Sequence, residues 1–354
     1  MTQEKTVVTA NSNLSSSRLD QFDGLRGLAI IIVVLSHCDI LNQGGLANGI
    51  FFGLTGFFLI NPFKDSYEQR FLSIWEILKF YKSRAVRILP SYYLILLFIY
   101  LQAGFRVIPK DIFLGLLCFS EIYEHLWFIY SYFWLMIIIP FVFMLILLLA
   151  KRINFLNNDM VCSVVFFVLA GISRLLFVFT DLFDIRFDQL LLGVCAGYLF
   201  RYFRKHGELF AKLTRKKLLG DSLIFFGLLF VVFSSSSFLG LLNPELQYFY
   251  IGWNYIFVVG VVMSFLVFLV GMYDLGLFGR FFSSKPMVFI GKLSLPIYLL
   301  NSFVIKQLNI QSKYFMFLCV FSISLLLAWV IDAAFSGIEG LFGKLISKNR
   351  MKEA

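Results

Sequence analysis

The sequence predicts an all-α polytopic membrane protein with about ten transmembrane helices and both termini in the cytoplasm. The first observation is composition: 60% of the 354 residues are hydrophobic, only 15% are charged, and the mean hydropathy is +0.84. A soluble domain leaves roughly a quarter of its unfolded-chain surface in water even when it is large, so it could not hide this much apolar area. The second observation is that several stretches reach the ~20 apolar residues that cross a bilayer. The third is an uneven distribution of Lys and Arg along the chain.

Ten stretches have a suitable length and hydropathy for membrane helices. In chain order they are 25–41, 47–61, 88–104, 126–150, 160–179, 188–203, 219–238, 248–272, 288–306 and 313–335. The region 105–125 holds an apolar run that is too short to cross, so we expect an external interfacial or re-entrant piece there. Residues 1–17 are polar and rich in Ser and Asn, which predicts a disordered cytoplasmic tail. The five cysteines are widely spaced in apolar stretches, which is typical of buried hydrophobic residues and not of a metal site.

The distribution of basic residues fits this topology. If the N-terminus is cytoplasmic, the inside segments hold 23 of the 31 Lys and Arg residues and the outside segments hold 5, as the positive-inside rule requires. The net charge of +10 then reflects topology and contact with anionic lipid, so nucleic acid is not needed as a partner. We therefore expect a multi-pass protein of the cell membrane (plasma or inner membrane), in contact with membrane lipid.

Polar side chains at membrane depth are costly, so each requires an explanation. Arg26 and His37 lie three helical turns apart on the first stretch, near one face and ~16 Å apart along the axis. Alone, His37 would be a histidine bonded to a neighbouring helix or an interfacial residue, and Arg26 a snorkelling anchor. Arg84 and Arg87 lie one turn apart and could simply be positive charge that keeps this segment in the cytoplasm. Paired guanidinium groups, however, also bind phosphate bidentately. With Arg26 they predict a cytoplasmic site for a phosphorylated donor whose thinner arm extends toward His37.

Several segments resemble the motifs of the acyltransferase-3 family of integral membrane acyltransferases. DGLRGLAIIIVVLSH at 23–37 resembles the first-helix motif, in which ten residues separate an arginine from a histidine. The other similar segments are IFFGLTGFFLI at 50–60, FYKSRAVRILPSYY at 80–93, HLWFIYSYFWLMIIIP at 125–140, GKLSLPIYLLN at 291–301 and IEGLF at 338–342. The resemblance covers nearly the whole chain. It implies a single acyltransferase-3-like transmembrane domain at 18–343, followed by a basic cytoplasmic tail at 344–354.

The resemblance implies an enzyme that moves an acyl group, usually acetyl, from cytoplasmic acyl-CoA to a hydroxyl on an extracytoplasmic or lipid-linked acceptor. That acceptor is commonly a cell-surface sugar, so the implied partners are acetyl-CoA (or another acyl-CoA) and a surface glycan or lipid-linked sugar, without a metal. It also implies His37 as the catalytic histidine, Arg26 as its partner, and Arg84 and Arg87 as the pair at acyl-CoA. In addition, Glu339 resembles a glutamate that follows the last span.

Three positions depart from the family's pattern. Thr55 stands where serine is usual and keeps the hydroxyl. Tyr132 stands where members with a fused extracellular hydrolase-like domain often have glutamate, and that domain is absent here. Asn301 replaces a frequent histidine, so a second catalytic imidazole is not expected in the ninth stretch. The last two departures fit a stand-alone member of the family.

The chemistry of these residues suits acyl transfer even when the family resemblance is set aside. A base is needed for the hydroxyl proton, and the imidazole of His37 titrates near working pH; it could instead carry the acyl group as a covalent relay. Donors are needed for the charge that develops on the thioester oxygen, and the candidates are Thr55, Tyr298 and Asn301. Asp23 either caps the first helix, the interpretation that we favour, or orients Arg26.

The outer end of the fourth stretch offers a candidate acceptor site. His125 and Trp127 are either residues of the interfacial aromatic belt or a wall on which a sugar stacks.

Two other function classes also fit the sequence. A transporter or flippase for a lipid-linked sugar or small molecule would use ten spans and intramembrane charge as well, and a catalytically silent partner of another acyltransferase would keep the fold.

Overall fold

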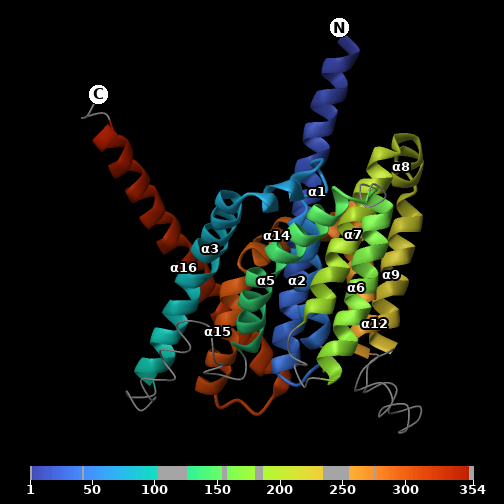
Figure 1. Cartoon of the computed structure of the whole chain (residues 1–354). Helices are drawn as coiled ribbons and strands as arrows, with labels where there is room; N and C mark the ends of the chain where they lie inside the picture. The colour runs from blue at the N-terminus through green and yellow to red at the C-terminus, as the bar shows by residue number, and fades with distance from the viewer. Residues whose placement is uncertain are drawn as a thin grey trace.

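The computed structural model describes residues 2–41, 44–102, 126–153, 158–179, 186–233, 255–273 and 276–350. Within these ranges the chain is helical and has no strand, which confirms the all-α prediction for them. Figure 1 shows the helices side by side in one bundle, with the start of α1 and the end of α16 projecting from the same end. The helices are α1 (Thr2–His37), α2 (Gly44–Leu59), α3 (Ile74–Gln102), α5 (Trp127–Ala150), α6 (Asp159–Phe179), α7 (Phe187–Lys205), α8 (Gly207–Thr214), α9 (Lys217–Phe233), α12 (Tyr255–Met272), α13 (Leu277–Phe282), α14 (Lys285–Lys292), α15 (Ser294–Gln307) and α16 (Lys313–Arg350), with a 3-10 helix η1 (Tyr67–Leu72) between α2 and α3.

Each of the ten predicted spans overlaps a helix of the structure. Three helical segments of the described chain are long and apolar enough to cross a membrane, namely Trp127–Ala150, Asp159–Leu176 and Lys313–Phe335. The pair α14 and α15 would form a fourth span, bent by 72°. The number of ten spans and the cytoplasmic position of both termini therefore stay predictions. The predicted external piece at 105–125 lies outside the described residues.

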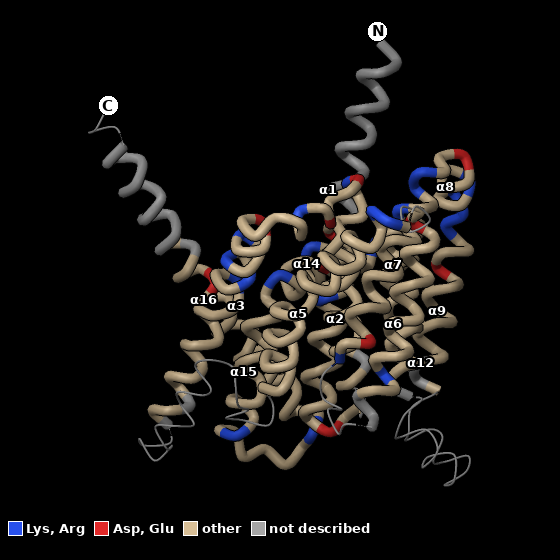
Figure 2. The backbone as a smooth tube through the Cα atoms, in the orientation of Figure 1, with Lys and Arg blue, Asp and Glu red and all other residues tan. Residues whose placement is uncertain are grey.

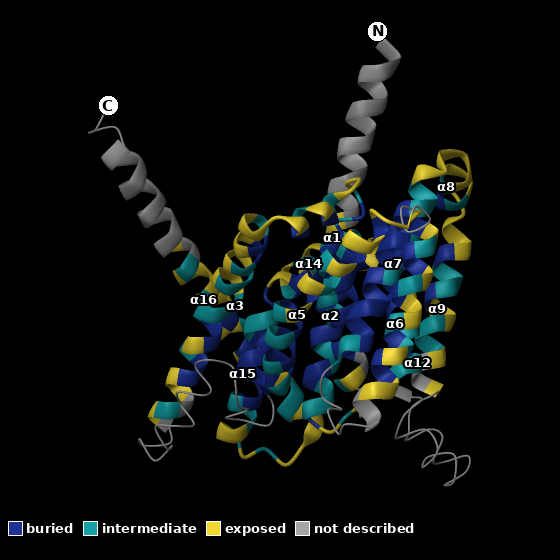
Figure 3. Ribbon diagram, viewed as in Figure 1, coloured by how far each residue is buried: buried dark blue, intermediate teal, exposed yellow. Residues whose placement is uncertain are grey.

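Exposed residues lie on the outward faces of the bundle (Figure 3), and many of the exposed residues of the chain are large and apolar. Leu175 on α6, Phe226 on α9 and Leu318 on α16 are all more than half exposed. Contiguous exposed apolar surface is unfavourable in water and is typical of helices that face lipid. Many described Lys and Arg residues gather at the end from which α1 and α16 project (Figure 2). This arrangement supports a membrane protein with one strongly basic end.

Close backbone contacts fix α1 against its neighbours. A Cβ atom at Gly291 on α14 would lie 1.7 Å from the carbonyl oxygen of Asp23, and one at Gly27 would lie 2.4 Å from that of Met287. Glycine is needed at such crossings because any side chain would separate the two backbones. The contact holds α14 beside the turn of α1 that carries Arg26.

A proline lies near the start of each helix of the bent pair α14 and α15. Pro286 and Pro296 lie in the first turns of α14 and α15, where a missing N–H costs no helical hydrogen bond. The chain bends by 72° between these helices, and α15 packs against α1 and α3. Because of this turn, Tyr298 and Asn301 face α1 residues more than 260 positions earlier in the sequence.

The N-terminal helix is longer than the sequence predicts. Its backbone is helical from Thr2, so α1 also includes 2–17, the polar stretch for which composition predicts a disordered tail. At the other end, α16 continues to Arg350, through most of the predicted basic tail at 344–354. The domain boundaries given by the sequence stay predictions.

Candidate active site

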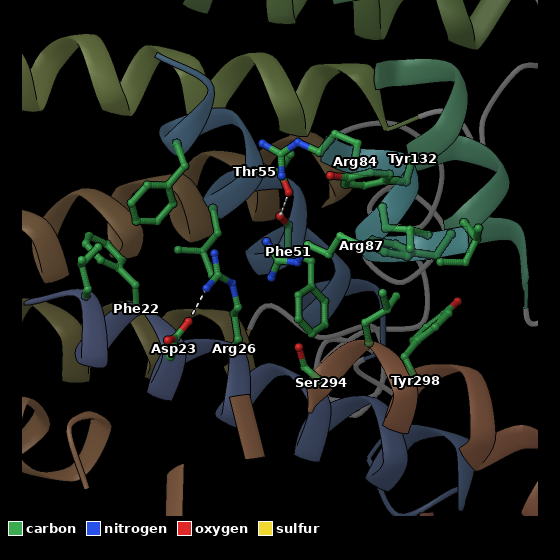
Figure 4. Close-up of a pocket in the computed structure, with 17 residues that line it drawn as sticks. Phe22, Asp23, Arg26, Phe51, Thr55, Arg84, Arg87, Tyr132, Ser294 and Tyr298 are labelled. Atoms are coloured by element: carbon green, nitrogen blue, oxygen red, sulfur yellow. Dashed lines mark hydrogen bonds and ion pairs between the residues drawn. The ribbon is translucent and has the colours of Figure 1, made fainter. Parts of the chain in front are cut away.

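A cavity of about 510 Å³ lies among α1, α2, α3, α5 and α15. Its lining includes Arg26 from α1 and both Arg84 and Arg87 from α3. Figure 4 shows the three guanidinium groups directed into the same space. The sequence predicted that these arginines form one cluster, and the structure places all three on one cavity.

Arg26 is held by a carboxylate on its own helix. Asp23, one turn earlier, forms an ion pair with the guanidinium, and the ring of Phe58 lies 5.7 Å from the guanidinium carbon. Asp23 lies inside α1, far from its first residue, so the helix-cap interpretation is wrong and the orienting interpretation agrees with the contact. Asp23 cannot cap the helix because α1 continues through the polar stretch that precedes it.

The other two arginines add positive charge that no carboxylate of the described residues offsets. Arg84 packs over the ring of Phe80 at 5.3 Å. In the part of the chain that the structure describes, neither Arg84 nor Arg87 forms an ion pair, and Asp23 is the single acidic residue in the cavity lining. Three guanidinium groups and one carboxylate leave a net positive charge, which suits a ligand with phosphate groups.

One end of the cavity is aromatic. The ring of Phe128 lies 5.9 Å from that of Phe51 and 5.2 Å from that of Tyr298, all three being lining residues. Tyr298 is one helical turn before Asn301, the partner of His37, so this end of the cavity is the one nearer to His37. The sequence did not single out Phe51 or Phe128, because in a chain with 45 Phe residues nothing distinguishes them from the core.

His37 lies beyond this aromatic end and is not among the residues that line the cavity. Its Nδ1 is 2.5 Å from Oδ1 of the fully buried Asn301, and Ser302 Oγ is 3.4 Å from the same nitrogen. The straight helix α1 places His37 ~16 Å along the axis from Arg26, as its spacing predicts. The structure therefore brings the arginines together in one cavity and the histidine with Asn301 in the layer next to it.

The three candidate donors for the thioester oxygen differ in what they offer. Asn301 donates both amide hydrogens to backbone carbonyls, to Ile297 at 3.1 Å and to Tyr298 at 2.6 Å. The hydroxyl of Thr55, a lining residue, donates to the carbonyl of Phe51 at 2.8 Å. Tyr298 also lines the cavity. In this geometry the hydrogens of Asn301 and Thr55 are committed to backbone oxygens.

The predicted acceptor wall is only partly described. Trp127 begins α5, and the guanidinium carbon of Arg186 lies 5.4 Å from the centre of its ring, so this arginine occupies one face of the indole. His125 lies outside the described residues. Glu339 lies on α16, but its side chain is outside the described part. The sugar-stacking role of Trp127 stays a prediction.

A second, apolar cavity of about 260 Å³ lies between α3 and α5. It shares Arg84, Ile88, Ile129 and Tyr132 with the first cavity. The hydroxyl of Tyr81 donates to the carbonyl of Ile137 at 2.9 Å and ties the two helices together beside it. Tyr132, noted in the sequence as a departure from glutamate, thus lies in the wall between the two cavities.

Among the described residues, no three His, Cys, Asp or Glu side chains gather as a metal site would require.

The comparison with protein families gave one match. The family model described as an acyltransferase domain, of the acyltransferase-3 type, matches residues 19–333. This match includes every lining residue of the arginine cavity together with His37 and Asn301. No curated protein and no solved structure matches the chain.

Proposed function

Because the chain belongs to the acyltransferase-3 family, we propose that it is a membrane O-acyltransferase with cytoplasmic acyl-CoA as donor. The acyl group is acetyl, and the acceptor is a hydroxyl of an extracytoplasmic or lipid-linked carbohydrate at the cell surface. The observation that carries this proposal is the convergence of Arg26, Arg84 and Arg87 on one cavity in the layer next to His37. A plain helical bundle has no need for three guanidinium groups in one cavity.

The arginines bind the phosphates of the donor. Arg84 and Arg87 project from successive turns of α3, and planar guanidinium groups hold phosphate oxygens through paired N–H donors. Arg26 faces them from α1, oriented by Asp23. The narrow arm of acyl-CoA then points toward Phe128 and Tyr298, at the end of the cavity nearer to His37.

The reaction moves the acyl group from sulfur to oxygen. With His37 as general base, its imidazole takes the proton of the acceptor hydroxyl while that oxygen attacks the thioester carbonyl carbon. The C–S bond breaks, and the proton passes to the departing sulfur, so the products are an ester and free CoA thiol. With His37 as relay, the imidazole attacks first, CoA leaves, and the acceptor hydroxyl takes the acyl group from the acyl-imidazole.

Thiol release from acetyl-CoA by the purified protein in proteoliposomes tests this proposal. We expect time-dependent formation of free CoA by the wild-type protein and its loss in His37→Ala. The matched control is His206→Ala, because His206 is exposed at the end of α7, where its ring contacts Tyr202. Turnover that survives in His37→Ala would refute the mechanism. A transporter would move its substrate without releasing CoA.

The acceptor is tested separately. Mass spectrometry of surface glycans from cells with and without the protein should show acyl esters that depend on His37. Trapping with radiolabelled acetyl-CoA without acceptor distinguishes the two roles of His37, since only the relay leaves label on the protein.

A further inference from the structure

We propose that Asn301 is a positioning residue that fixes the tautomer of His37, with the proton on Nδ1 and the lone pair on Nε2. The inference rests on the proposed function, because it concerns the histidine that carries out acyl transfer there. It concerns a contact between residues 264 positions apart, which neither the sequence pattern nor the family resemblance assigns.

The orientation of the Asn301 amide is set by its own helix. Its NH₂ group donates to the carbonyl oxygens of Ile297 and Tyr298, one turn earlier on α15. A flipped amide would place its oxygen against these two oxygens and turn its hydrogens toward His37. Because Asn301 is fully buried, water could not compensate for that loss. The amide oxygen is therefore the atom that faces the imidazole.

This orientation decides which nitrogen of His37 carries the proton. An amide oxygen only accepts hydrogen bonds, so Nδ1 at 2.5 Å must be the donor. In a neutral ring with a proton on Nδ1, the lone pair lies on Nε2. Both a general base and a covalent relay need a lone pair on a nitrogen of fixed direction.

The amide of Asn301, the partner of His37, carries no charge. Ser302 donates to the same amide oxygen at 3.3 Å, so two uncharged donors share it. A carboxylate in this position would add a charge at membrane depth, where ionised groups are costly. Asn301 thus orients the ring without adding a charge. Asn301 stands where the resemblance has a frequent histidine, so α15 offers an amide to His37 in place of a second imidazole.

Histidine NMR tests the tautomer directly and does not depend on activity. The chain has only three histidines, so ¹⁵N-histidine labelling gives three sets of ring signals, and His37→Ala identifies one of them. We expect His37 of the wild-type protein to show a protonated Nδ1 and an unprotonated Nε2 when the ring is neutral. We expect Asn301→Leu, which keeps the branched shape of the side chain and removes the acceptor, to lose this signature. A wild-type ring protonated on Nε2 would overturn the inference.

Kinetics provide the second test. Asn301→Leu should lower kcat for acetyl-CoA by ~10-fold or more, as loss of an orienting partner does for other functional histidines, with KM within ~2-fold because the arginines are unchanged. Asn301→Asp keeps an acceptor oxygen and should retain more activity than Asn301→Leu. The control is Asn48→Leu, the same change at a buried asparagine of α2 that does not line the cavity.

The two proposals fail in different ways. An unchanged kcat in Asn301→Leu, while His37→Ala is inactive, would refute the role of Asn301 and leave the acyltransferase standing. Full activity in His37→Ala would refute the proposed function, and the NMR result would still decide the tautomer.

Discussion

Arg201 at the end of α7 binds both oxygens of Glu68 on η1, with each N–O distance 2.7 Å. The same guanidinium binds Asp159 at the start of α6, and Lys205 binds the other oxygen of that carboxylate. Arg201, Glu68 and Asp159 are all buried. This cluster ties η1, which packs against α3 and α5, to α6 and α7. It therefore positions the chain that leads into the helix of Arg84 and Arg87.

Arg201→Met should destabilise the folded protein by ~3–5 kcal/mol, because it removes the guanidinium that both buried carboxylates bind and leaves Asp159 with Lys205 alone. The measurement is thermal or denaturant unfolding in detergent. Lys79→Ala is the control, since Lys79 and Glu76 form an exposed pair whose loss should cost less than ~1 kcal/mol. Equal Tm values for the two variants would contradict the structural role of the cluster.

Arg84→Ala and Arg87→Ala should each raise the KM for acetyl-CoA by about tenfold or more. Each change removes charge-assisted contacts to phosphate, which contribute ~1.5–3 kcal/mol. Steady-state thiol release measures this effect. Lys82→Ala removes the same charge from the same helix at an exposed position outside the cavity and should leave KM unchanged. Unchanged donor affinity in both arginine variants would place the donor site elsewhere.

Asp23→Asn should separate the two kinetic constants. The carboxylate neutralises one of three cavity guanidinium groups, so its loss should lower the KM for the anionic donor. The same loss frees Arg26 from its oriented position, so kcat should also fall. Steady-state kinetics across a range of salt concentration checks this, because added salt should weaken the gain in affinity. A raised KM with unchanged kcat would contradict it.

Gly291→Ala should destabilise the protein by ~1–3 kcal/mol, because its Cβ would lie 1.7 Å from the backbone oxygen of Asp23 and force α14 away from α1. Gly171→Ala is the matched control. Gly171 lies in helix α6 with nothing within 4 Å of an added Cβ, so alanine there should be neutral or stabilise by up to ~1 kcal/mol. The comparison is made by thermal unfolding, and a Tm for Gly291→Ala at or above wild type would rule out the close crossing.

The sequence by itself determined the helical, apolar character of the chain, because hydropathy and charge act on each segment separately. It also determined that Arg26 and His37 share one helix three turns apart, since the period of a straight helix fixes that spacing. The clustering of Arg84 and Arg87 with Arg26 was predicted from charge and motif together, and the structure places all three on one cavity.

Only the tertiary structure decided which side chains meet across helices. The contact of His37 with Asn301 depends on the turn between α14 and α15 and on how closely α1 approaches them, and no local pattern encodes that approach. Likewise, Arg201 lies at the end of the predicted span 188–203 without an assigned partner, yet it is the centre of a buried ion cluster. Asp23 was assigned to a helix start that does not exist there. For His37 and Arg201 the partner lies on another helix, and packing between helices sets which residues meet.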